Sequence, residues 1–152
     1  MKILMVCLGN ICRSPLAEGI LRSKISEKHI VASAGTISFH KGSPPDDRST
    51  KIAKEYGVDI SYQRANHFTE SHLEEFDKIF CMDLKNLEDV ISKASFEEQK
   101  NKVALIMEEV DFLSDEKIEV PDPYYGDMSD FEKVYQMLDQ ACEAIVKKYE
   151  LR

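Results

Sequence analysis

The chain has 152 residues, of which 43% are hydrophobic and 32% are charged, and its formal net charge at pH 7 is −8. This length predicts one folded domain, residues 1–152, and the acidic charge argues against nucleic-acid and membrane partners, since both require a basic face. No stretch of the sequence approaches transmembrane length and the four cysteines are sparse, so we expect a cytoplasmic protein with reduced thiols. Its small acidic surface favours a monomer.

Strand and helix signals alternate along the first half of the chain. Residues 3–6 form a short apolar run typical of a buried parallel strand, and a helix opens at residue 14 or 15. Residues 30–34 predict a second strand, followed by a helix over about residues 46–56. Residues 71–74 (SHLE) resemble a capping box and predict one short helical turn.

The alternation continues in the second half. Residues 77–82 and 103–107 predict the third and fourth strands, with a helix between them from residue 83 or 84 to 93. A long loop over residues 108–128 follows, and loops of that length are often functional. Residues 129–132 (SDFE) form a capping box that opens a long terminal helix. The four βα units predict an α/β domain with a four-stranded parallel sheet and helices on both faces.

The segment after the first strand predicts a phosphate-binding loop. Cys7 and Arg13 bracket five residues, a spacing that suits a loop curled around a phosphate-like oxyanion. The amides of such a loop point inward and the arginine holds two oxygens, which keeps a cysteine at its mouth as the nucleophilic thiolate. The other residues assigned to this loop are Leu8, Gly9, Asn10, Ile11, Cys12 and Ser14.

Individual roles are expected for several of these loop residues. Gly9 and Asn10 suit left-handed backbone conformations. Ser14 can donate a hydrogen bond to the sulfur of Cys7 and so stabilise the thiolate. Cys12 either packs within the loop or forms a reversible redox disulfide with Cys7, and its spacing leaves both roles open.

The candidate general acid is Asp122, in the long loop. Attack by Cys7 on a phosphate ester expels an oxygen leaving group, which a positioned acid should protonate. Asp122 stands between two prolines that stiffen the backbone, and Tyr124 and Tyr125 follow it and can form a pocket wall. The same carboxylate can then activate water to hydrolyse a phosphocysteine, a two-step reaction that needs no metal. The alternative is an aspartate that only forms a turn.

The remaining cysteines and the histidines suggest no further chemistry. Cys81 falls on a predicted strand and Cys142 on the apolar stripe of the terminal helix, so both are expected to be buried core thiols. The four cysteines lack zinc-site spacing and the four histidines lack ligand spacing, and we expect the histidines to face solvent.

Four segments of the chain resemble the low-molecular-weight protein-tyrosine phosphatases. They are residues 7–15 (CLGNICRSP), 33–36 (SAGT), 81–83 (CMD) and 122–125 (DPYY), in the order and spacing of that family. The resemblance implies a four-stranded parallel α/β fold and hydrolysis of phosphotyrosine in proteins without a cofactor. It also implies that Cys7 is the nucleophile, Arg13 the phosphate clamp and Asp122 the general acid.

The resemblance also bears on the pocket rim and on two departures from the family. It places Tyr124 and Tyr125 at the rim, and leaves open whether either is phosphorylated. The family often carries Trp on the pocket wall, but this chain has no Trp and offers Phe39 there. Many members have a histidine that supports the phosphate-binding loop, where this chain has Gln63.

Three rival functions are weighed against these residues. An arsenate reductase of this fold needs a relay of further cysteines, and Cys81 has no partner nearby in the sequence. A phosphoarginine phosphatase is the nearer alternative, although related enzymes of that type carry Thr where this chain has Ile11 and lack the double tyrosine. A phosphate-binding module without catalysis would have lost Cys7 or Asp122, and both are present.

Overall fold

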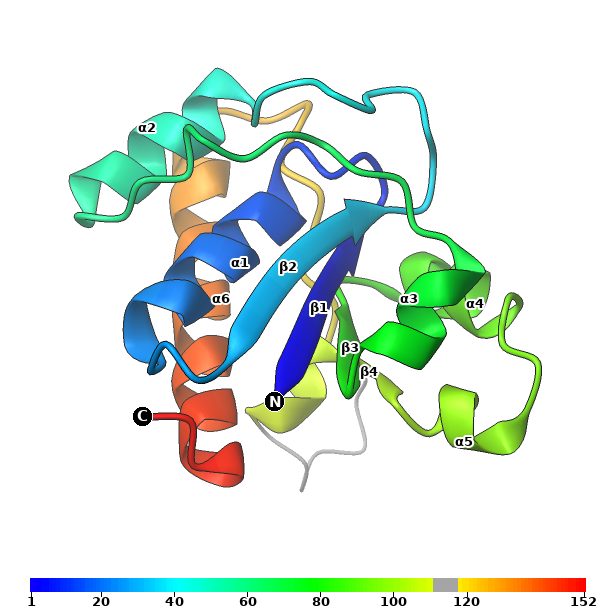
Figure 1. Ribbon diagram of the computed structural model, residues 1–152. Coiled ribbons are helices and arrows are strands. Elements are labelled where there is room, and N and C mark those ends of the chain that lie inside the picture. The colour runs from blue at the N-terminus through cyan, green and yellow to red at the C-terminus, as the bar shows by residue number, and fades with distance from the viewer. Residues whose placement is uncertain (111–117) are drawn as a thin grey trace.

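A four-stranded parallel sheet lies at the centre of the molecule (Figure 1). The structure, a computed structural model, describes residues 1–110 and 118–152. The strands are β1 (Lys2–Cys7), β2 (Ile30–Gly35), β3 (Lys78–Cys81) and β4 (Val103–Leu105), in the order β2-β1-β3-β4. The chain leaves β1 toward one edge of the sheet and β3 toward the other, so the carboxyl ends of β1 and β3 mark the point where such sheets bind ligands. The predicted parallel α/β fold is confirmed.

Helices cover both faces of this sheet (Figure 1). One face carries α1 (Arg13–Lys24), α2 (Asp47–Glu55) and α6 (Met128–Tyr149). The other carries α3 (Glu70–Glu75), α4 (Leu84–Ile91) and α5 (Glu97–Lys100). Among the described residues, no helix is both long and apolar enough to cross a membrane.

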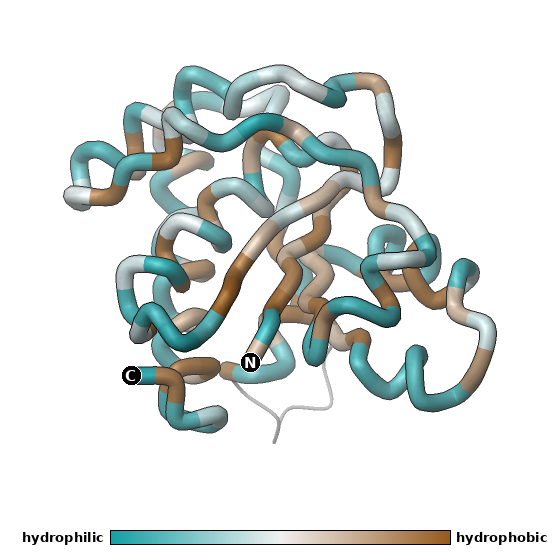
Figure 2. The backbone as a smooth tube through the Cα atoms, viewed as in Figure 1, coloured by the Kyte–Doolittle hydropathy of each residue, from teal (hydrophilic) through white to brown (hydrophobic). Residues whose placement is uncertain are grey.

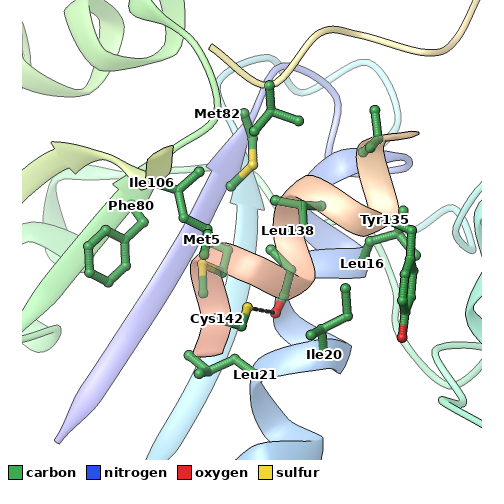
Figure 3. Packing of buried hydrophobic residues seen from close by; sticks show 14 of the residues in the cluster. Met5, Leu16, Ile20, Leu21, Phe80, Met82, Ile106, Tyr135, Leu138 and Cys142 are labelled. Atoms are coloured by element: carbon green, nitrogen blue, oxygen red, sulfur yellow. Dashed lines mark hydrogen bonds between the residues drawn. The ribbon is translucent and has the colours of Figure 1, made fainter. Parts of the chain in front are cut away.

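The apolar run of β1 feeds two separate cores because its side chains alternate between the faces of the sheet. Ile3 and Met5 pack on the side of α1 and α6, where α6 contributes Leu138 and Cys142 (Figure 3). Leu4 and Val6 of β1 pack on the side of α3 and α4. Figure 2 shows the hydrophobic segments gathered along the strands and the inner helix faces, with hydrophilic segments outside. A strand buried on both faces explains why residues 3–6 show no polar alternation.

The capping box predicted at residues 129–132 is wrong. The N-cap of α6 is Asp127, whose carboxylate accepts hydrogen bonds from the amides of Ser129 and Asp130. Asp130 returns the contact by accepting from the amide of Asp127 at 2.9 Å. An aspartate two residues ahead of the serine therefore satisfies the free amides of the first turn, and the helix starts earlier than predicted.

Other element boundaries also differ from the prediction. The short helix α3 begins after Thr69, whose amide donates to His72 Nδ1, and not at the capping box predicted for residues 71–74. The strand predicted to end at residue 107 ends at Leu105, and a 3-10 helix, η1 (Ile106–Glu109), follows. Helix α5 was not predicted. Part of the predicted long loop, residues 111–117, lies outside the described residues.

Candidate active site

The phosphate loop, residues 7–14, connects β1 to α1 at the carboxyl end of the sheet. Cys7 is the last residue of β1, and Arg13 is the first residue of α1. Asn10 has a φ of 56°, so the left-handed conformation predicted for it is confirmed. The same prediction for Gly9 is wrong, since Gly9 is not among the residues with positive φ. A Cβ at Gly9 would lie 2.9 Å from the ring of His40, so a larger residue there would force the His40 side chain to move.

Hydrogen bonds from outside the loop orient its peptide groups. Four carbonyl oxygens accept them: Cys7 from the Thr36 amide (3.0 Å), Leu8 from the Ile37 amide (3.1 Å), Ile11 from the Asp46 amide (2.8 Å) and Cys12 from Ser49 Oγ (3.2 Å). A trans peptide group holds its N–H opposite to its C=O. The amides of the four following residues therefore point away from these donors, as a loop that binds an anion requires.

A directed chain of hydrogen bonds ends at the sulfur of Cys7. The backbone amide of Asn66 donates to Asn10 Oδ1 at 2.8 Å, which orients the Asn10 side chain. Asn10 Nδ2 consequently donates to Ser14 Oγ at 2.7 Å. The hydroxyl hydrogen of Ser14 is then free to point at Cys7 Sγ, 3.0 Å away. Ser14 is thus placed to stabilise negative charge on the sulfur.

Arg13 is buried, and two hydrogen bonds anchor its guanidinium. Its Nη1 donates to Asp83 Oδ2 at 2.7 Å and to the carbonyl oxygen of Val120 at 2.9 Å. Burial disfavours the charge on Arg13, but Cys7 and two carboxylates outweigh that effect, and the pKa of the guanidinium is raised above its ordinary value. The side chain therefore stays cationic and fixed, with donors left for a ligand.

The other three cysteines are held as neutral thiols. Burial, together with nearby negative groups, raises the pKa of Cys12 to about 12. Cys81 and Cys142 are buried, which confirms the prediction that they are core thiols, and burial raises the pKa of each. Cys142 donates to the carbonyl oxygen of Ala17 (Figure 3). Since a raised pKa disfavours the thiolate at these three residues, Cys7 is the candidate nucleophile.

Asp122 lies beside the phosphate loop, near Arg13. It belongs to the acid loop, which we define as residues 121–126. Its Oδ2 is 3.9 Å from Arg13 Nη2, and its Oδ1 accepts from the amide of Tyr124 at 3.1 Å. The second contact is the turn geometry that an aspartate favours. Asp122 therefore forms a turn with one oxygen and faces the arginine with the other, and 43% of its side chain is exposed.

A cavity of about 300 Å³ joins the phosphate loop to the acid loop. Its lining comprises Cys7, Leu8, Gly9, Ile11, Cys12, Arg13, Ile37, Phe39, His40, Asp122, Tyr124 and Tyr125. The residues predicted for the pocket, Phe39, Tyr124 and Tyr125, all line it, and Phe39 and Tyr125 are 83% and 94% exposed. His40 lines the cavity with its ring near that of Phe39, so the expectation that every histidine only faces solvent is wrong.

The match to a family model covers nearly the whole chain. The model described as low molecular weight phosphotyrosine protein phosphatase matches residues 2–151. The chain belongs to this family.

Three proteins of similar sequence or structure match this chain over nearly its full length. The human low molecular weight phosphotyrosine protein phosphatase is 37% identical over 156 residues, covering 97% of this chain and 94% of that protein. A crystal structure of a protein tyrosine phosphatase from Entamoeba histolytica is 39% identical, with a TM-score of 0.87 over 99% of this chain and 97% of that one. A Drosophila arginine phosphatase is 29% identical, with a TM-score of 0.90 over 99% of this chain and 98% of that one.

Sequence reasoning missed Asp83 as a site residue in this family member. Asp83 lies two residues beyond the end of β3, and its carboxylate both caps α4 through Asn86 and binds Arg13. Its place at the carboxyl end of a central strand was the available signal. Gln63 is buried and donates to the carbonyl oxygen of Pro15 at 3.0 Å, so it supports the first turn of α1.

Proposed function

We propose that the protein hydrolyses phosphotyrosine in proteins, and small aryl phosphates, through a phosphocysteine formed on Cys7. The observation that carries the proposal is a single pocket that holds the sulfur of Cys7, the guanidinium of Arg13 and the carboxyl of Asp122. Membership of the phosphotyrosine protein phosphatase family supports the same reaction.

In the first step, the thiolate of Cys7 attacks the phosphorus of the bound ester. Arg13 and the amides of the phosphate loop hold the non-bridging oxygens and stabilise the charge that they carry. The bond between phosphorus and the aryl oxygen breaks, and protonated Asp122 transfers its proton to that oxygen. The products of the step are a neutral phenol, a phosphocysteine and an ionised Asp122.

In the second step, the carboxylate of Asp122 removes a proton from a water molecule, whose oxygen attacks the phosphorus. The bond between sulfur and phosphorus breaks, and inorganic phosphate leaves. Cys7 is released as a thiolate, which the hydroxyl of Ser14 stabilises as a leaving group. Asp122 ends the cycle protonated, so the reaction balances without a metal.

The shape of the pocket favours an aryl ester. Cys7 is only 3% exposed, whereas the rim residues Phe39 and Tyr125 are largely exposed. A phenyl ring extends phosphorus farther from the peptide than a serine side chain does, so phosphotyrosine reaches the recessed sulfur and phosphoserine does not. The aromatic rim can contact the flat ring on the way in.

Phosphoarginine is the second candidate substrate, because a Drosophila arginine phosphatase has a closely similar fold. Two features of this chain favour the aryl ester over it. Ile11 places a branched aliphatic side chain in the pocket lining, and Tyr124 and Tyr125 place two aromatic rings there.

The test is a comparison of matched peptides that carry phosphotyrosine, phosphoarginine or phosphoserine, with p-nitrophenyl phosphate as a small substrate. We expect steady turnover of the aryl esters in the presence of a metal chelator, with the highest kcat/KM for phosphotyrosine. Cys7→Ser should abolish turnover and retain binding of inorganic phosphate. No turnover between about pH 5 and 7 would contradict catalysis, and a higher kcat/KM for phosphoarginine would reassign the substrate.

A further inference from the structure

Arg48, in the first turn of α2, contacts the acid loop and the helix that follows it. Its Nη2 donates to the carbonyl oxygen of Tyr124 at 2.9 Å, and its Nη1 donates to that of Gly126 at 3.2 Å. Its guanidinium carbon also lies 5.6 Å from the ring centroid of Tyr124 and 4.5 Å from that of Phe131 in α6. One side chain therefore holds the acid loop at two carbonyl groups and rests on an aromatic ring behind it.

The same turn of α2 also binds the phosphate loop. The amide of Asp46 donates to the carbonyl oxygen of Ile11 at 2.8 Å, and Ser49 Oγ donates to that of Cys12 at 3.2 Å. Arg48 donates from Nε and Nη2 to the two carboxylate oxygens of Asp46, at 2.9 and 3.0 Å. This forked pairing holds the pKa of Asp46 below its usual range, so the pair stays charged. The pair joins the two loops through a single helical turn.

The contact with Tyr124 leads directly to the candidate acid. The carbonyl group of Tyr124 accepts from Arg48, and the amide of the same residue donates to Asp122 Oδ1 at 3.1 Å. Arg48 thus fixes the backbone whose amide orients the carboxyl group of Asp122. Nothing in the sequence near Asp122 indicates this contact, since Arg48 precedes it by more than seventy residues.

We propose that Arg48 is a positioning residue that sets the place of Asp122 relative to Cys7, by tying the acid loop to the turn that holds the phosphate loop. The inference rests on the proposed function, because it assigns Asp122 the role of general acid. A displacement of about 1 Å at a reacting group costs catalysis strongly, even when substrate binding is retained. Loss of Arg48 should therefore weaken proton transfer more than phosphate binding.

Arginine suits this position because its guanidinium makes four hydrogen bonds in one plane, two to Asp46 and two to the acid loop. A lysine carries one compact ammonium group and cannot span the carboxylate and both carbonyl groups together. Arg48→Lys should therefore recover only part of the activity that Arg48→Met loses.

The test measures kcat/KM for a series of aryl phosphates, from p-nitrophenyl phosphate, a good leaving group, to phenyl phosphate, a poor one. For Arg48→Met we expect a loss of about 10-fold or more with phenyl phosphate and a much smaller loss with p-nitrophenyl phosphate. The inhibition constant of inorganic phosphate should change by less than about 2-fold, because Arg13 and the phosphate loop are intact. A residue that only stabilised the fold would not produce a loss that depends on the leaving group.

The second arm repeats Arg48→Met in an Asp122→Ala background. If Arg48 acts through Asp122, its replacement should have little further effect there, and the two losses should not add. The matched control is Arg152→Met, since Arg152 also pairs with a carboxylate, that of Glu143, but lies at the end of the chain. This control should retain the activity of the unmodified protein toward every substrate in the series.

The outcomes separate the positioning role from the proposed function. A wild-type protein that turns over no aryl phosphate overturns both. Normal wild-type turnover, with a loss in Arg48→Met that is equal for all leaving groups or that adds fully to the loss in Asp122→Ala, overturns the positioning role alone. Unchanged activity in Arg48→Met toward every substrate also overturns the positioning role alone.

Discussion

The direction of one hydrogen bond determines which group of the phosphate loop can donate to the sulfur of Cys7. The amide of Asn66 can only donate, so Asn10 must turn its oxygen toward it and its nitrogen toward Ser14. Ser14 in turn uses its hydroxyl hydrogen on the sulfur. This chain of hydrogen bonds therefore leaves the hydroxyl of Ser14 as a donor aimed at the sulfur that attacks and later leaves.

Replacing Ser14 by alanine tests that chain. Ser14→Ala should lower kcat/KM by about 10-fold or more, since a hydrogen bond to a charged group is worth roughly 1.5–3 kcal/mol. Steady-state kinetics measure the effect. Ser23→Ala, on the same helix but bonded to the carbonyl oxygen of Ile20, should leave kcat/KM unchanged, and an unchanged kcat/KM in Ser14→Ala would contradict the role.

At the residue scale, sequence reasoning reached the groups that lie in local motifs and missed those brought together only by folding. Cys7 and Arg13 share one loop, and their spacing alone suggested a common pocket. Asp83 belongs to one of the segments that resemble the family, but its contact with Arg13 arises only when β3 packs beside β1. His40 reaches the pocket lining only through the path of the segment after β2. The redox pairing of Cys12 with Cys7 stays a prediction.

At the scale of elements, hydrophobic pattern predicted the order of strands and helices but not where helices begin. The predicted N-caps of α3 and α6 are wrong for the same reason, since several polar residues compete for the same free amides. At α6 the N-cap is Asp127, because its carboxylate accepts hydrogen bonds from two amides at once. Pattern alone cannot rank such competitors, because the winner depends on the path of the chain entering the helix.

The cap of α6 gives a direct test of that competition. Asp127→Ala should lower the thermal midpoint by about 2–4 °C, and Ser129→Ala should lower it less. Hydrogen bonds from Ser129 hold the pKa of Asp127 below its usual range, so its contribution is present above the unfolded pKa and is lost as pH falls through the folded pKa. The gap between wild type and Asp127→Ala should therefore shrink in acid. A larger loss in Ser129→Ala, seen by calorimetry, would restore the cap predicted from sequence.

At the scale of the whole molecule, the two cores on either face of the sheet hold the strands whose carboxyl ends carry the site. The acid loop, which α2 contacts through Arg48, lines the other part of the pocket. Cys81 lies in the core under α3 and α4, and Cys142 in the core between α1 and α6. Both are buried without an opposing cation strong enough to offset burial, so the pKa of each thiol is raised. Cys12, at the base of the pocket, behaves alike.

Three buried thiols make the fold sensitive to alkali. A thiol with a raised pKa stays protonated in the folded state, while in the unfolded chain it ionises near 9.0. The folded state then binds more protons, so the free energy of unfolding is unaffected below that pH and falls as pH rises above it, by about 1.4 kcal/mol per pH unit for each thiol. Urea denaturation at a series of pH values from about 8 to 11 measures the slope.

Cys142→Ala isolates one thiol from the tyrosines and lysines that also titrate in this range. The variant should be less stable at every pH, because it leaves a cavity in the core between α1 and α6, where the sulfur donates to the carbonyl oxygen of Ala17. Its stability should nevertheless fall less steeply above about pH 9, since one ionising group has been removed from the unfolded chain. Parallel curves for the variant and the wild type would show that Cys142 ionises in the folded state as readily as in the unfolded one, which its complete burial argues against.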